Sequence, residues 1–198
     1  MWGTTYRVKI PESDMPAEAY WSSFFDPEQA LRDLGCVPGV DPVVEFGCGY
    51  GTFTIEAAKL TMGKVFALDI DPEMIDYTSR KANRAGLGEI ALCTRDFVER
   101  DTNLEDGSCG YAMLFNILHL EQPVELLKEA YRVLRPGGIV AIMHWNYDPA
   151  TPRGPSMDIR PRPEQCLAWA QEAGFQGVRL VELTTCPFHY GILGNRPA

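Results

Sequence analysis

Residues 43–54 read V-V-E-F-G-C-G-Y-G-T-F-T, and this stretch decides the fold. The apolar, β-branched run over residues 42–46 is typical of a buried parallel strand. Three glycines then alternate with other residues, and a backbone without a Cβ atom can turn tightly and approach a ligand closely. Apolar residues at helical spacing follow from Phe53. The stretch therefore predicts a strand, a glycine-rich ligand loop and a helix.

The same alternation of short apolar strands and helices continues along the chain. Further strands are expected at residues 64–69, 89–94, 111–116, 139–145, 178–184 and 187–193. Helices are expected at 17–34 (broken at Asp26-Pro27), from Asp71-Pro72 to Gly86, at 124–134, and at 164–173. We interpret Pro136-Gly137-Gly138 as the turn that ends the third of these helices. Such alternation predicts an α/β, doubly wound, mostly parallel sheet covered on both faces, in a single domain over residues 1–198.

Composition narrows the choice of partners. The chain has 198 residues and a formal net charge of −9, with 18 Lys and Arg against 27 Asp and Glu. Stable nucleic-acid binding is not expected of so acidic a chain, because it depends on cations that contact phosphates. No apolar run reaches the roughly 18 residues that would span a bilayer, and residues 1–16 lack a signal-peptide pattern, so a cytoplasmic location is expected. The six cysteines form no C-x-x-C, which favours free thiols and no metal site.

The glycine loop carries two features that separate it from a dinucleotide site. Its spacing is G-x-G-x-G, with Thr52 where the third glycine of a G-x-G-x-x-G fingerprint would lie. Glu45, two residues before the first glycine, would repel a pyrophosphate but suits a ligand with a positive sulfonium and ammonium. A plain strand-to-helix turn is the alternative interpretation, and a NAD-dependent reductase is a distant one.

Acidic residues follow the next two strands. Asp69 ends the second strand and is placed to accept the two hydroxyls of a ribose. Asp96 follows the third strand in T-R-D-F, where it can accept from an adenine amine while Phe97 packs near the ring. Asp71, beside Asp69, is better explained as a helix cap.

The successive motifs E-F-G-C-G-Y-G, A-L-D-I-D-P-E-M-I, T-R-D-F, F-N-I-L-H-L and Y-R-V-L-R-P-G-G resemble those of class I S-adenosylmethionine (SAM) methyltransferases, of the small-molecule branch called type 11. The resemblance covers about residues 41–145. It implies a Rossmann-like, seven-stranded sheet with an antiparallel last strand, SAM as cofactor and S-adenosylhomocysteine as product. It also implies that Asn116 lies near the methionine end of SAM. The expected cofactor-binding residues are Glu45, Gly47, Cys48, Gly49, Gly51, Asp69, Ile70, Asp96, Phe97 and Asn116.

The segments outside this core are expected to form the rest of the site. Residues 1–40 are expected to form a helical lid or cap, and residues 146–198 the acceptor side. The aromatic residues of the first helix either close over SAM as this lid or simply pack on the sheet edge; they are Tyr20, Trp21, Phe24 and Phe25.

Three residues are candidate catalytic groups: His119, His189 and Tyr190. His119 follows the fourth strand, where a general base and a structural histidine are both open interpretations. His189 and Tyr190 lie where the last two strands should meet, near the acceptor. His144, inside the fifth strand, favours a core role.

The 18-residue loop 146–163 is far longer than the usual connection between a strand and a helix, and long ordered loops are often functional. Arg153, Arg160 and Arg162 could bind an anionic acceptor there, or could be solvated and paired with nearby acids.

The sequence thus favours an enzyme that methylates a small molecule. A protein or RNA methyltransferase is the first alternative, and a SAM-binding protein without turnover is the second. The sequence indicates neither the acceptor nor the oligomeric state.

Overall fold

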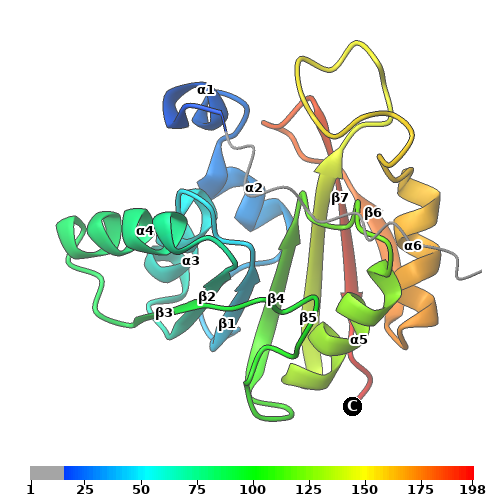
Figure 1. Cartoon of the computed structure of the whole chain (residues 1–198). Coiled ribbons are helices and arrows are strands. Elements are labelled where there is room, and N and C mark those ends of the chain that lie inside the picture. Colours follow the sequence, from blue (N-terminus) through cyan, green and yellow to red (C-terminus); the bar gives the residue numbers. More distant parts are fainter. Residues whose placement is uncertain (1–15) are drawn as a thin grey trace, which may run out of the picture.

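The computed structural model describes residues 16–198 as a seven-stranded sheet flanked by helices (Figure 1). The strands are β1 (Val43–Phe46), β2 (Val65–Asp69), β3 (Ile90–Thr94), β4 (Cys109–Phe115), β5 (Leu134–Trp145), β6 (Gln176–Val181) and β7 (His189–Asn195). Their order in the sheet is β3-β2-β1-β4-β5-β7-β6, and β7 is antiparallel to both of its neighbours. The predicted Rossmann-like fold with an antiparallel last strand is therefore confirmed.

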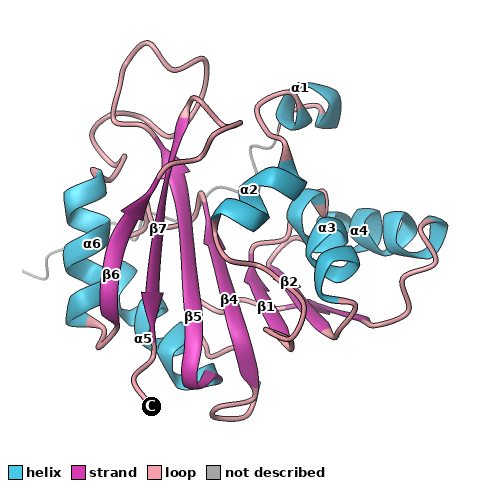
Figure 2. Cartoon of the chain, turned by 180° about the vertical axis from the view of Figure 1, so that it is seen from behind, coloured by secondary structure: helices cyan, strands magenta, loops and turns pink. Residues whose placement is uncertain are grey.

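Six helices lie around the described sheet. They are α1 (Glu18–Ser22), α2 (Pro27–Asp33), α3 (Thr52–Thr61), α4 (Pro72–Arg84), α5 (Pro123–Val133) and α6 (Pro163–Glu172). In Figure 2, α2 and α3 lie in front of the sheet and α5 lies behind it. The middle of the sheet is thus covered on both faces, and every residue of β1 and β4 is buried as a result.

Local sequence explains where these helices begin. Asp26 and Asp71 each precede a proline, and each carboxylate accepts a backbone N–H of the first turn, from Gln29 and Glu73 respectively. A short side-chain acceptor followed by proline is a favoured helix start. The predicted cap role of Asp71 and the break at Asp26-Pro27 are confirmed.

The predicted end of the helix at residues 124–134, with a turn at Pro136-Gly137-Gly138, is wrong. Helix α5 ends at Val133, and Leu134 opens β5 by pairing with Cys109 of β4. Pro136-Gly137-Gly138 is therefore not a free turn but an irregular part of β5, where the register of the pairing shifts. Its glycines exchange hydrogen bonds with Arg196, which gives the stretch partners that a sequence pattern does not show.

The carboxyl ends of β1, β2, β4 and β5 meet at one edge of the sheet. The order of strands reverses between β1 and β4, the position at which ligands bind in open α/β sheets. Helix α1 and the loop 146–162 both lie above this edge (Figure 1).

The predicted lid segment 1–40 is described only from residue 16, and its first fifteen residues lie outside the described part. Among residues 16–198, the length and apolarity needed to cross a membrane are found in no helix.

Candidate functional site

The glycine loop after β1 has a backbone that other residues would strain. Gly47, Gly49 and Gly51 have φ values of +82°, +50° and +69°. A Cβ atom at Gly51 would lie 2.7 Å from the side chain of Thr78, so the loop packs tightly on α4. Glycine is thus required by conformation and by space.

Asp69, at the end of β2, joins this loop to the start of α4. Its Oδ2 accepts the Gly49 N–H at 2.8 Å, and its Oδ1 accepts the Asp71 N–H at 3.0 Å. The carboxylate is 7% exposed, and burial raises its pKa. Ile70, the next residue, is 51% exposed beside it. The carboxylate is therefore fixed by two backbone donors at the edge where ligands bind.

Glu45 lies beneath the glycine loop, buried between β1 and α3. The Thr54 hydroxyl donates to its Oε2. Burial, with a further contribution from the charge of Asp69, raises the pKa of Glu45 to about 8. Within residues 16–198, neither Glu45 nor Asp69 forms an ion pair with Lys or Arg. Two buried acids without a cation suit a positively charged ligand.

Cys48, inside the loop, is 5% exposed. Burial, followed by the charge of Glu45, raises the pKa of its thiol. The thiol therefore stays protonated, and a contact of the Cys48 backbone with a cofactor stays a prediction.

Buried polar atoms without hydrogen-bond partners gather at the carboxyl edge. Across the described residues, the side chains with such atoms are Thr52, Asn116, His144 and His189. Both amide atoms of Asn116 and both ring nitrogens of His189 are among them. Thr52 begins α3, Asn116 follows β4, His144 is near the end of β5, and His189 starts β7. Buried polar groups are normally paired, so these four side chains have hydrogen-bonding capacity left over at this edge. His144 and His189 lie on opposite faces of the sheet, because His144 pairs with Tyr190 and His189 with Trp145.

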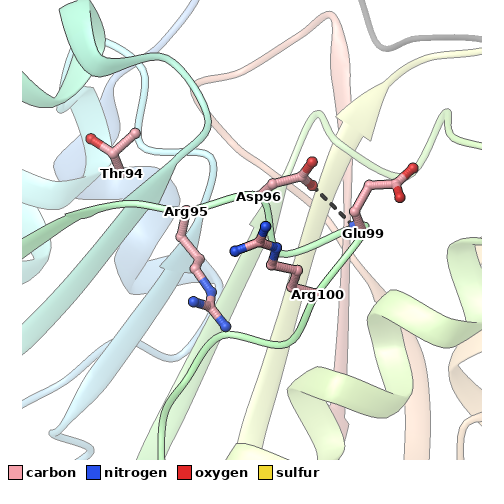
Figure 3. Close-up of a pocket in the computed structure, with 5 residues that line it drawn as sticks. All are labelled: Thr94, Arg95, Asp96, Glu99 and Arg100. Carbon is pink, nitrogen blue, oxygen red and sulfur yellow. Dashed lines mark hydrogen bonds between the residues drawn. The ribbon is translucent and has the colours of Figure 1, made fainter.

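Asp96 and Phe97 follow β3, where the sequence places adenine. Asp96 Oδ1 accepts the N–H groups of Val98 at 3.2 Å and Glu99 at 3.0 Å, and Figure 3 shows the second bond. Asp96 also lines a pocket of about 370 Å³ together with Thr94, Arg95, Glu99 and Arg100. Phe97 is buried and packs edge-to-face on Phe46, with ring centroids 5.4 Å apart. A contact of either residue with adenine stays a prediction.

His189 and Tyr190 point to opposite faces of the sheet, because neighbouring residues of a strand alternate. The Tyr190 hydroxyl donates to the Pro161 carbonyl at 3.1 Å and lies 3.3 Å from Cys166 Sγ, inside the core on the α6 side. Burial raises the pKa of Tyr190. The expectation that Tyr190 lines one pocket with His189 is therefore not met, since its hydroxyl is already satisfied.

His189 lies on the other face, among aromatic rings. Its ring centroid is 4.1 Å from that of Trp145 and 4.7 Å from that of Phe25. Burial, with the charge of Arg160 adding to it, lowers the pKa of His189 to about 3. The imidazole is therefore neutral at physiological pH.

His119 and His144 form a pair, with Nδ1 of His119 3.3 Å from Nε2 of His144. Burial lowers the pKa of both side chains. The structure thus gives His119 a buried histidine as partner. In the described part of the chain, no group of three His, Cys, Asp or Glu side chains could hold a metal ion.

The loop 146–162 is organised around Arg160. This guanidinium is 7% exposed and donates to the carbonyls of Asn146, Asp148 and Pro155 at 2.7 to 3.1 Å, and to the Thr151 hydroxyl. The prediction that Arg160 binds an anionic acceptor is therefore wrong, because its donors already hold the loop together. The spacing of the arginines along the chain carries no signal of this role.

Arg162, in the same loop, lies over the ring of Tyr147 at 3.7 Å from the centroid. Its guanidinium thus contacts an aromatic face within the loop itself.

The aromatic residues of the N-terminal segment reach the edge from above. Phe24 packs on Trp145 at 5.2 Å and on Phe188 at 6.2 Å, and Phe25 packs on Phe53 at 5.2 Å. The sequence singled out Phe24 and Phe25, but it did not indicate that Trp145 and Phe188 complete the cluster. Those partners come from two distant segments, the end of β5 and the turn before β7.

Residues 43–138 match a family model described as a methyltransferase domain. The chain is 31% identical over 159 residues to cycloartenol-C-24-methyltransferase 1 of Oryza sativa subsp. japonica, covering 72% of this chain and 45% of that protein. It is 32% identical over 108 residues to ribosomal protein L11 methyltransferase of Gloeobacter violaceus, covering 54% and 32%. The chain thus spans less than half the length of these two relatives.

A solved structure resembles most of the described fold. The crystal structure of a SAM-dependent methyltransferase from Aquifex aeolicus is 27% identical, with a TM-score of 0.77, and the match covers 87% of this chain and 90% of that one. The family model, the strand order and the motifs at the strand ends all indicate the same kind of domain. Through residues 43–138, the chain belongs to the methyltransferase domain family of class I SAM-dependent methyltransferases.

Proposed function

We propose that this chain binds SAM across the carboxyl edge of β1, β2 and β4 and transfers its methyl group to a small molecule. One observation carries the proposal: Glu45 and Asp69 are buried acids without a cationic partner in the described residues, on either side of a tight glycine loop. A dinucleotide phosphate would be repelled there, whereas a ligand with positive charge and a ribose diol fits.

Each end of SAM has residues of suitable chemistry. Asp69 would accept the ribose hydroxyls, Asp96 the adenine amine, and the unpaired amide of Asn116 would bind near the methionine end. The glycine loop allows the backbone to approach the cofactor. When bound, SAM supplies an electrophilic methyl group, and the protein has mainly to align the acceptor and exclude water. The aromatic residues above the edge suit that exclusion.

The small-molecule acceptor is supported by two observations. The relative from Oryza is named for methylation of cycloartenol, a small apolar molecule, and the residues above the edge here are largely aromatic. The net charge of −9 argues against a nucleic-acid acceptor. A protein acceptor is the second candidate, because the relative from Gloeobacter is named for methylation of a ribosomal protein.

Calorimetry with SAM, S-adenosylhomocysteine and NADH tests the cofactor site. We expect binding of the first two ligands and none of NADH. Asp69→Ala removes a charged acceptor, worth about 1.5–3 kcal/mol per hydrogen bond, and should weaken SAM binding about tenfold or more. Asp76→Ala, at an exposed position of α4, is the matched control and should bind SAM as the parent does. Unchanged SAM affinity in Asp69→Ala would contradict the proposed site.

A further inference from the structure

A second pocket lies apart from the residues expected to bind the cofactor. It has a volume of about 430 Å³, within the range of pockets that hold small molecules. Its lining comes from α1, α2, α3 and the C-terminal end of α4, and it includes none of the expected cofactor-binding residues. Helices α3 and α4 lie side by side, with α1 above them (Figures 1 and 2). The pocket is therefore a separate cavity in the helical layer rather than part of the cofactor site.

The buried part of this lining is formed by two residues of α3, one turn apart. Ile55 is 7% exposed and supplies an apolar wall. Thr52 is 9% exposed, and its hydroxyl is buried without a hydrogen-bond partner. A hydroxyl both donates and accepts hydrogen bonds, and buried polar groups are normally paired. The pocket thus offers one unsatisfied polar group beside an apolar surface.

Cations outnumber acids around this pocket. Lys59 of α3 and Lys81 and Arg84 of α4 line it, and the described lining contains one acid, Glu56. Glu56 pairs with Lys59 at 2.7 Å, and Lys81 pairs with Glu18 of α1 at 2.9 Å. Arg84 forms no ion pair with a carboxylate in the described part of the chain. In a chain with a net charge of −9, three cations at one pocket indicate a ligand with negative charge.

The packing of α3 on α4 brings these groups together. A Cβ atom at Gly51, the residue before Thr52, would lie 2.7 Å from the Thr78 side chain. Lys81 follows Thr78 by about one helical turn, and Arg84 follows Lys81 by about one more. Residues three apart share one face of a helix, so both cations continue the face that Thr78 presents to the start of α3. The Thr52 hydroxyl and the two cations of α4 therefore border one opening.

We propose that this pocket binds a small organic anion, a molecule with a compact apolar body and one carboxylate or phosphate group. The apolar body contacts Ile55, which a bare inorganic ion would leave uncovered. The Thr52 hydroxyl donates to the anionic group, and Lys81 and Arg84 neutralise its charge. A cationic molecule would be repelled by the same side chains, and a neutral one would gain no attraction from them. This ligand is additional to SAM and to the methyl acceptor.

Amide NMR titrations of the full chain, with and without S-adenosylhomocysteine, test the proposal with four probes. These are benzoate, phenyl phosphate, benzyl alcohol and inorganic phosphate. We expect benzoate and phenyl phosphate to shift the amide signals of Thr52, Ile55 and Lys81, and the tighter of the two identifies the anionic group. Benzyl alcohol lacks the charge and inorganic phosphate lacks the apolar body, so each should bind at least about fivefold weaker than the tighter organic anion.

Substitutions separate this pocket from a general attraction of anions to the surface. Lys59→Gln combined with Arg84→Gln removes two cations and should weaken binding of the tighter organic anion about fivefold or more. Lys128→Gln is the matched control, because Lys128 forms the same i,i+3 pair with Glu125 at 2.8 Å but lines no part of this pocket. Thr52→Val removes the hydroxyl at nearly constant shape and should weaken binding about threefold to tenfold, whereas Thr52→Ser should retain it.

Shifts centred on the glycine loop, or displacement of S-adenosylhomocysteine by benzoate or phenyl phosphate, would overturn the proposal, because the anions would then occupy the cofactor site. Equal binding of benzyl alcohol, parental binding by the double variant or by Thr52→Val, an equal loss in Lys128→Gln, or no shift with any probe at millimolar concentration overturns it as well. A chain that binds the organic anions but not S-adenosylhomocysteine leaves this pocket standing and overturns the proposed function instead.

Discussion

Glu45→Gln tests whether the site holds a buried acid at the expense of stability. Glutamine has nearly the same shape and keeps an oxygen that accepts the Thr54 hydroxyl, but it carries no charge. In the SAM-free protein the Glu45 carboxylate is fully buried and has no cationic partner in the described residues. We therefore expect the substitution to stabilise the SAM-free protein at neutral and alkaline pH, while it weakens SAM binding.

The size of the effect follows from the pKa of Glu45, which folding raises from an ordinary 4.5 to about 8. The folded protein thus holds this proton more tightly than the unfolded chain does. The contribution of this Glu45 proton to the stability of the folded protein is full below pH 4.5 and is lost as the pH rises toward 8. One pKa unit corresponds to about 1.4 kcal/mol, so the loss is about 3 kcal/mol at pH 7 and about 5 kcal/mol above pH 8. For a chain of this size, about 3 kcal/mol corresponds to a Tm difference of about 6–12 °C.

Thermal melts of the SAM-free parent and Glu45→Gln at pH 5, 7 and 8.5 provide the assay. The variant should melt higher than the parent at pH 7 and higher still at pH 8.5, with little difference at pH 5. Glu129→Gln is the control. Burial raises the pKa of Glu129, but hydrogen bonds from Arg132 and Thr102 outweigh burial, and the pKa is lowered as a result. The Glu129→Gln variant should therefore melt at a lower temperature than the parent at pH 7. A Glu45→Gln variant that melts at or below the parent at pH 8.5 refutes the reasoning.

Three further substitutions separate structural from functional residues. Gly51→Ala should lose about 1–3 kcal/mol of stability and most SAM binding, because the new Cβ atom would meet Thr78 and the residue has a positive φ. Thermal melts measure the stability and calorimetry measures the SAM binding. Parental values in both measurements would contradict this expectation. Arg160→Gln should leave SAM affinity unchanged but release the loop, seen as faster trypsin cleavage after Arg153; equal cleavage rates would show that Arg160 does not organise it. Tyr190→Phe should cost about 1 kcal/mol in chemical denaturation without a change in SAM affinity, and weaker SAM binding would place Tyr190 in the site.

Local signals in the sequence were sufficient for the fold, for the conformation of the glycine loop and for the helix starts. Strand-to-helix turns with glycine and Asp-Pro helix starts act within a few residues, so Gly51 and Asp71 were assigned roles that the geometry matches. The sheet order follows from connection rules that apply to any such alternation. The boundary at Leu134 was missed because its partner, Cys109, lies 25 residues away in the sequence.

The acceptor side was harder to predict because its contacts are long-range. Arg160 looked like a surface cation in a proline-rich loop, yet its donors turn inward to carbonyls of the same loop. Tyr190 and His189 are adjacent in the sequence, but the alternation of β7 sends them to opposite faces, and only His189 joins the aromatic cluster. A one-residue difference in the start of the strand would have exchanged these roles.

The measurement that tests the central claim most directly is methyl transfer from labelled SAM into a fractionated cell extract. The purified protein is incubated with methyl-labelled SAM and, separately, with the small-molecule, protein and RNA fractions, and Asp69→Ala serves as the binding-deficient control. We predict that the label appears in the small-molecule fraction, in compounds extractable into organic solvent, and that Asp69→Ala transfers at most about a tenth as much at limiting SAM. Label in the protein or RNA fraction, or no transfer to any fraction by a protein that binds SAM, would contradict the account.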